Sequence, residues 1–118
     1  MDFKNLKLRS NDELIDLYFD YIGDSNFIRA LEEFSIGNGF GLLDVGCEFA
    51  HNFEEWEEGY FGEKGVQILF SNPLLEEDEE FEISAKEFFD GIKRAVIKFG
   101  LCNAYYENLI KLIEERIK

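Results

Sequence analysis

The spacing of the hydrophobic residues changes twice along this chain, and the change limits the folds that are open to it. Residues 14–22 and 27–34 carry hydrophobic side chains at helical spacing, and residues 88–99 and 106–117 do so again. Between them, residues 43–49 alternate hydrophobic and polar side chains, as in a strand with one buried face. Helices at both ends of a chain with strands between them predict an α+β fold.

Signals for helix starts and stops lie where this periodicity begins and ends. Ser10 with Glu13, and Ser84 with Glu87, have capping-box spacing, in which each side chain satisfies the backbone N–H of the other residue. Residues 23–25, Gly-Asp-Ser, interrupt the first helical pattern and offer a new cap. These signals predict an N-terminal helix pair and a C-terminal helix pair.

Two further segments are expected to be strands. Residues 66–70 form a hydrophobic run, and residues 80–83 alternate again. A turn is expected at residues 71–73, which include the single proline of the chain. No helical pattern separates the strands, so we expect an antiparallel meander. The chain is therefore predicted to be one α+β domain, residues 1–118, with a small antiparallel sheet of three or more strands packed on the two helix pairs.

The negative charge of the chain is concentrated in its middle. The formal net charge is −14, from 26 acidic and 12 basic residues. Residues 44–82 hold 13 of the acids and one base, Lys64, and so carry −12; the remaining 13 acids and 11 bases carry −2. Self-repulsion in such a field costs stability, which favours a basic partner over the alternative that the acids only keep the protein soluble. The same charge argues against binding to nucleic acid or to anionic membranes.

The strand pattern indicates where these acids lie. Asp44 and Glu48 alternate with the hydrophobic residues of the first strand, and Glu80 and Glu82 alternate with those of the third. Because successive side chains of a strand point to opposite faces, all four are expected on the solvent-exposed face of the sheet. The unbroken acidic run at residues 76–80 is expected to be a solvated loop that extends the same surface.

Residues 51–62 combine four glutamates with four aromatic residues, and they contain the single Trp and the single His of the chain. Aromatic residues with a polar group are enriched in interface cores, and acids around them would steer a basic partner. In the alternative interpretation, Phe53, Trp56 and Phe61 only pin this segment onto the core. With the acids of the sheet, the candidate partner-binding residues are Asp44, Glu48, Glu54, Glu55, Trp56, Glu58, Tyr60, Glu80 and Glu82.

Few residues could support catalysis or metal binding. His51 is the only histidine, and no serine or cysteine lies in a recognisable nucleophile motif. A metal site of His51 with nearby glutamates such as Glu48 would have a single nitrogen ligand, which is weak support for a transition metal. We therefore expect no catalytic residues, no cofactor and no metal, and we rank a small enzyme or metal binder built around His51 as the least favoured hypothesis.

The sequence also bears on location. Cys47 and Cys102 are far apart and match no metal-binding spacing, so we expect buried thiols in a reducing compartment. Neither a signal-peptide pattern nor an apolar stretch long enough to span a membrane is visible, so a soluble, cytoplasmic protein is expected.

Several short motifs resemble the immunity proteins of bacterial contact-dependent growth inhibition (CDI), and within them the group that neutralises ribonuclease toxins. The resemblance covers roughly residues 40–100. It lies in His51-Asn52-Phe53, Trp56, Tyr60-Phe61-Gly62, Gly65-Val66 and Ser84-Ala85-Lys86-Glu87-Phe88.

This resemblance implies that the protein lies in the cytoplasm of the producing cell, binds the C-terminal toxin domain of its own system and covers the nuclease active site. The partner would then be a basic protein domain, bound 1:1 by a protein that is a monomer when free. An alternative remains open from the residues alone. An acidic adaptor, or a mimic of nucleic acid, could use the same surface to bind a basic regulatory protein.

Overall fold

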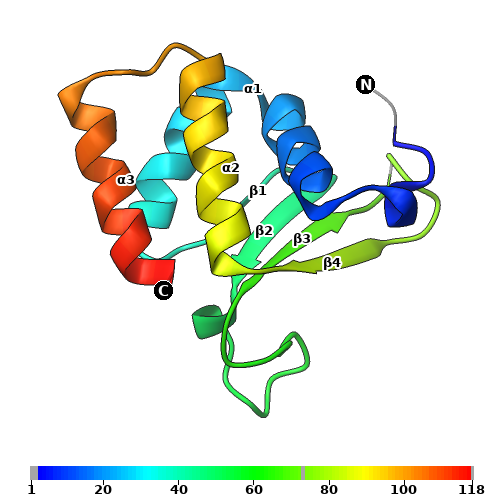
Figure 1. Cartoon of the computed structure of the whole chain (residues 1–118). Coiled ribbons are helices and arrows are strands. Elements are labelled where there is room, and N and C mark those ends of the chain that lie inside the picture. The colour runs from blue at the N-terminus through cyan, green and yellow to red at the C-terminus, as the bar shows by residue number, and fades with distance from the viewer. Residues whose placement is uncertain (1–2, 73, 118) are drawn as a thin grey trace.

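The computed structural model describes residues 3–72 and 74–117, and over these residues it places helices on one face of a four-stranded antiparallel sheet (Figure 1). The helices are α1 (Asn11–Ser35), α2 (Ala85–Lys98) and α3 (Ala104–Ile117), with the short 3-10 helices η1 (Leu6–Leu8) and η2 (Ala50–Asn52). The strands are β1 (Phe40–Gly41), β2 (Val45–Phe49), β3 (Val66–Phe70) and β4 (Glu79–Ile83). The predicted α+β fold is confirmed.

The helix α1 consists of two helical halves joined at Gly23. The Ser10–Glu13 capping box begins the helix, as predicted. At Gly23 the backbone leaves the helical region, with φ 78° and ψ 171°, a conformation open almost only to glycine. The chain changes direction there, so the first half crosses the sheet while the second half runs toward α3 (Figure 1). The predicted interruption at residues 23–25 and the N-terminal helix pair are confirmed.

The helix α2 begins at the predicted Ser84–Glu87 capping box and packs closely on α1. A Cβ on Gly91 would lie 2.3 Å from the Cγ2 atom of Ile15, so only glycine allows this separation of the two helices. The helix α3 begins after Asn103, whose Oδ1 atom accepts a hydrogen bond from the backbone N–H of Tyr106 at 3.2 Å. The predicted C-terminal helix pair is thus also confirmed.

The strands follow one another in the sheet in the order β1-β2-β3-β4, which is the expected antiparallel meander. The predicted strands at 66–70 and 80–83 correspond to β3 and β4, and β1 is an added edge strand. Part of the predicted turn, Pro73, lies outside the described residues. Side chains of alternate positions point toward the helices and are buried: Val45, Cys47, Phe49, Val66, Ile68, Phe70 and Ile83.

Aromatic rings join the sheet to the helices. The Phe88 ring of α2 packs against Phe49 of β2 and against Phe19 and Phe34 of α1, with ring centroids 5.5–6.0 Å apart. Buried aromatic side chains remove large areas from water, so this cluster ties the inward face of the sheet to both helices. Among the residues that the structure describes, none forms a helix on the opposite face of the sheet (Figure 1).

Two expectations about individual side chains are wrong. Asp44 does not lie on the exposed face: its side chain is buried and accepts a hydrogen bond from the hydroxyl of Tyr21 on α1. The reason is that β2 begins only at Val45, so the alternation of the strand does not extend back to Asp44. Cys102 is exposed, because it lies in the connection between α2 and α3, whereas Cys47 is buried as expected.

Candidate partner-binding surface

The outward face of the sheet carries the acids that strand alternation placed there. Pairing between the strands puts Glu48 of β2 opposite Gln67 of β3, and Gln67 opposite Glu82 of β4. Glu80 lies in the next row, and its Oε2 atom accepts a hydrogen bond from the Nε2 atom of Gln67 at 3.2 Å. Glu48, Glu80 and Glu82 are all exposed. We call these three residues the acidic sheet face.

Glu48 lies where the edge strand β1 approaches β2. A Cβ on Gly39 would lie 2.8 Å from the Oε2 atom of Glu48 and 2.1 Å from the carbonyl oxygen of Cys47. This close approach takes water away from one side of the carboxyl group. Desolvation raises the pKa of Glu48, because the charged form loses more hydration than the neutral form. The protein therefore holds a carboxylate at this position at a cost in stability.

Residues 53–65 leave η2, extend away from the sheet and return to β3 (Figure 1); we call them the projecting loop. The rings of Phe53 and Phe61 pack edge to face across this loop, with centroids 6.1 Å apart. Gly59 lies against the Phe53 ring, where a Cβ would come within 2.6 Å of a ring carbon. The loop is thus held by its own side chains rather than by the main core.

A turn at the tip of the projecting loop is closed by Glu57. Its Oε1 atom accepts a hydrogen bond from the backbone N–H of Glu54 at 2.9 Å, and its own N–H donates to the carbonyl of Glu54 at 2.9 Å. Glu57 is partly buried in this role, whereas Glu54, Glu55 and Glu58 are exposed. The turn therefore directs three of the four glutamates into solvent.

Trp56 lies on the same turn, and its side chain is 83% exposed. The interpretation that Trp56 pins this segment onto the core is therefore wrong, although Phe53 and Phe61 do pack on each other. Tyr60, in the same loop, is partly buried. Desolvation raises the pKa of the Tyr60 hydroxyl, and the negative charges of Glu63 and Glu55 add to the shift.

Four basic residues of α2 form ion pairs with acids of α1 and α2. Lys86 and Lys93 each form an ion pair with Asp90, at 3.5 and 3.6 Å, and Arg94 pairs with Asp16 at 3.0 Å. Lys98 pairs with Asp20 in the same layer. Between residues that the structure describes, the one ion pair that reaches the acids of 44–82 joins Glu79 to Lys7, at 3.8 Å. The charge of the acidic sheet face and the projecting loop is thus left for solvent or for a partner.

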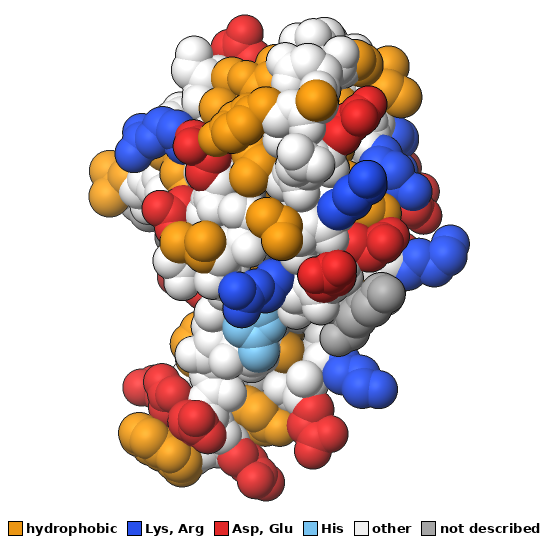
Figure 2. Space-filling model, turned by 90° about the vertical axis from the view of Figure 1, so that its left-hand side faces the viewer, with side chains coloured by type: hydrophobic (Ala, Val, Ile, Leu, Met, Phe, Trp, Pro, Cys, Tyr) orange, Lys and Arg blue, Asp and Glu red, His pale blue; other side chains and the backbone are white. Residues whose placement is uncertain are grey.

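The surface view supports this division. In Figure 2, acidic side chains gather around a hydrophobic one on the projection at the lower end, whereas basic and acidic side chains are interspersed over the helices above it. The acidic sheet face adjoins the projection, because Glu48 is the last residue but one of β2 and Gln67, opposite it, is the second residue of β3. Glu48 and Glu82 therefore lie at the end of the sheet next to the projection, and Glu80 lies one row farther from it.

His51 has a structural position at the base of the loop. Its Nε2 atom lies 2.7 Å from the carbonyl oxygen of Gly37, which also accepts a hydrogen bond from the Asn52 side chain at 2.9 Å. These bonds tie η2 to the turn after α1. Within residues 3–72 and 74–117, no three His, Cys, Asp or Glu side chains are grouped so that they could hold a metal ion.

An exposed acidic face next to a loop that presents an exposed tryptophan is a combination typical of protein–protein interfaces. The family model described as CDI immunity protein matches residues 11–113 of the chain. The chain therefore belongs to the CDI immunity protein family, whose members confer immunity against a CDI toxin. The match extends beyond the motifs at residues 40–100 to include α1 and most of α3. No curated protein matches the chain.

In the two described segments, no helix is both long enough and apolar enough to cross a bilayer.

Proposed function

We propose that this chain neutralises a cognate CDI toxin by binding its C-terminal toxin domain with the acidic sheet face and the projecting loop. The observation that carries this proposal is the row Glu48–Gln67–Glu82, which lies at the same end of the sheet as the loop that presents Trp56. Asp44, which is buried, is left out of the contact surface.

The chemistry of this surface fits a basic partner. Its carboxylates steer a positively charged domain during encounter and select against partners of the same sign. Trp56 supplies a large hydrophobic contact among these charges, and exposed aromatic residues of this kind often dominate binding energy. Because the projecting loop is held by Phe53, Gly59 and Phe61, little ordering entropy is lost when it binds.

The toxin that fits best is a ribonuclease. A nuclease active site must carry positive charge to hold the phosphates of its substrate, and an acidic inhibitor competes for the same charges. On this proposal the inhibitor is not an enzyme, acts in the cytoplasm of the producing cell as a monomer and binds one toxin domain. Glu54, Glu55, Glu58 and Tyr60 contact the basic site together with Trp56.

Charge reversal at two positions tests the proposed surface. The double variant Glu80→Lys with Glu82→Lys is compared with Glu107→Lys with Glu115→Lys, which makes the same change in net charge at exposed positions of α3. Binding is measured by calorimetry against the purified toxin domain of the cognate CDI system. We expect the first variant to weaken binding at least about tenfold and the second to change it less than about threefold. Equal effects of the two variants would show that only net charge matters, and would contradict the proposal that the acidic sheet face contacts the toxin domain.

The nature of the toxin is tested separately. The toxin domain is incubated with total RNA and with plasmid DNA, with and without the full chain. We expect the toxin domain to cleave RNA but not DNA. We expect this cleavage to stop at a 1:1 ratio of inhibitor to toxin. Cleavage of DNA, or no nuclease activity, would contradict the ribonuclease proposal while leaving the immunity function in place.

A further inference from the structure

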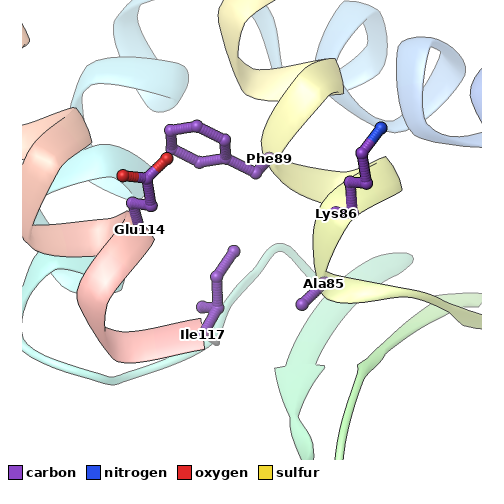
Figure 3. Close-up of a pocket in the computed structure, with 5 residues that line it drawn as sticks. All are labelled: Ala85, Lys86, Phe89, Glu114 and Ile117. Atoms are coloured by element: carbon purple, nitrogen blue, oxygen red, sulfur yellow. The ribbon is translucent and has the colours of Figure 1, made fainter.

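A groove separates the N-terminal end of α2 from the C-terminal end of α3. Ala85, Lys86 and Phe89 line it from α2, and Glu114 and Ile117 line it from α3, around a volume of about 370 Å³ (Figure 3). We call this the α2–α3 groove. Most of its lining atoms are apolar, and it is open to solvent. Neither the acidic sheet face nor the projecting loop contributes a residue to it.

One acidic residue, Glu114, and one basic residue, Lys86, line the groove. Figure 3 shows Phe89 and Glu114 directed toward each other across the gap, while the Lys86 side chain points away. Lys86 forms an ion pair with Asp90, which Lys93 also contacts. Glu114 has no ion-pair partner among the residues that the structure describes. The groove therefore presents an apolar floor, with the Glu114 carboxylate at its rim and the Lys86 side chain directed away from the gap.

The groove continues toward the acidic sheet face. A second cavity, of about 410 Å³, shares Ala85 and Ile117 with the first and is also lined by Glu82 and Lys64. Glu82 belongs to the acidic sheet face. A single partner seated on that face can therefore reach the groove without crossing another part of the molecule.

We propose that the α2–α3 groove is a second contact point for the toxin domain and takes one of its lysine or arginine side chains. Long basic side chains lay their methylene stems on apolar surface and keep the charged group at its edge. Here the stem lies on Phe89 and Ile117, and the cation meets Glu114. This inference rests on the proposed function, because the partner is the same toxin domain.

Two variants and a matched control test the groove by calorimetry with the purified toxin domain. Glu114→Lys reverses the charge at the rim, and Phe89→Ala removes part of the floor. Glu115→Lys makes the same charge reversal at the neighbouring exposed position of α3, which does not line the groove. We expect Glu114→Lys to weaken binding at least about tenfold and Glu115→Lys less than about threefold. Urea unfolding of each free variant separates loss of contact from loss of fold.

Hydrogen exchange of the wild-type complex provides a reading that needs no variant. We expect toxin binding to slow amide exchange in residues 85–89 and 113–117 as well as in residues 45–49 and 79–83. If only the sheet were protected and Glu114→Lys bound with unchanged affinity, the α2–α3 groove would not be a contact point for the toxin domain. The proposed function would still stand. If Glu80→Lys with Glu82→Lys also bound normally, the proposed function itself would fail.

Discussion

Tyr21 on α1 donates a hydrogen bond to the carboxylate of Asp44, which lies one residue before β2. The bond raises the pKa of the Tyr21 hydroxyl, because the neutral phenol is the form that donates to the carboxylate. The Phe3 ring packs edge to face against Tyr21 on the same side, with centroids 5.5 Å apart. The contact joins the first half of α1 to the end of the sheet that lies farthest from the projecting loop.

Breaking this contact should lower stability without touching the proposed interface. Tyr21→Phe removes the donor and leaves the Asp44 carboxylate buried without it. We expect a loss of about 1–2 kcal/mol in the free energy of unfolding, measured by urea titration. Affinity for the toxin domain, measured well below the unfolding midpoint, should remain within about twofold of wild type. A large loss of affinity in a folded Tyr21→Phe variant would indicate that the region around Asp44 takes part in binding the toxin domain.

Truncation of Trp56 should have the opposite profile. The side chain is 83% exposed, so Trp56→Ala should change the free energy of unfolding by less than about 0.5 kcal/mol. As an anchor of the interface, it should contribute at least about 2 kcal/mol to binding. Ile97→Ala is the matched control, because Ile97 is 73% exposed on α2. If both variants bind the toxin domain equally well, Trp56 is not an anchor.

Glu48 should show a conflict between stability and binding. Desolvation raises the pKa of Glu48 in the folded state, so folding favours its protonated form. The stability that this preference contributes is fully present below the ordinary carboxyl pKa and is lost as the pH rises through the raised pKa. Glu48→Gln has no such loss, and we expect it to be more stable than wild type at pH 7 and to lose this advantage at pH 4. The same variant should bind the toxin domain more weakly. A variant that is less stable at pH 7 would show that desolvation does not dominate at this site.

Glu87 should contribute to stability in the opposite pH direction. Its pKa is lowered, first by the Ser84 hydroxyl, which donates to its Oε1 atom at 2.9 Å, and then by the Asn11 amide, which donates at 3.2 Å. Its contribution is therefore present above the ordinary carboxyl pKa and lost as the pH falls through the lowered value. Between about pH 5 and pH 3, the free energy of unfolding should fall less steeply in Glu87→Gln than in wild type.

The variant Asn11→Ala gives a second reading of this link. It removes the donor on α1 but keeps the capping box of α2 intact. We expect the urea midpoint of Asn11→Ala to fall less with decreasing pH than that of wild type. The difference from wild type should be smaller than for Glu87→Gln. If Glu87→Gln and wild type lost stability in parallel on acidification, the hydrogen bonds to Glu87 would not be the source of the effect.

Local rules were sufficient for the elements of this fold and for the outward face of its sheet. The capping boxes at Ser10 and Ser84 depend only on residues three positions apart, and the break at Gly23 depends on one residue. Glu48, Glu80 and Glu82 were placed correctly because alternation within a strand decides the face on which a side chain lies. The sequence also indicated the family, through motifs concentrated around the projecting loop.

Contacts between distant segments were decided by the tertiary structure alone. Alternation placed Asp44 in solvent, but the strand begins one residue later and Tyr21, 23 positions earlier in the chain, takes up its carboxylate. Whether Trp56 lay inside or outside depended on Phe53 and Phe61 packing on each other instead of on the core. The α2–α3 groove depends on how two helix ends are spaced after packing, which no pattern along the chain encodes. The sequence determined period, caps and charge, because these are local; burial and grooves followed from the packing of the assembled fold.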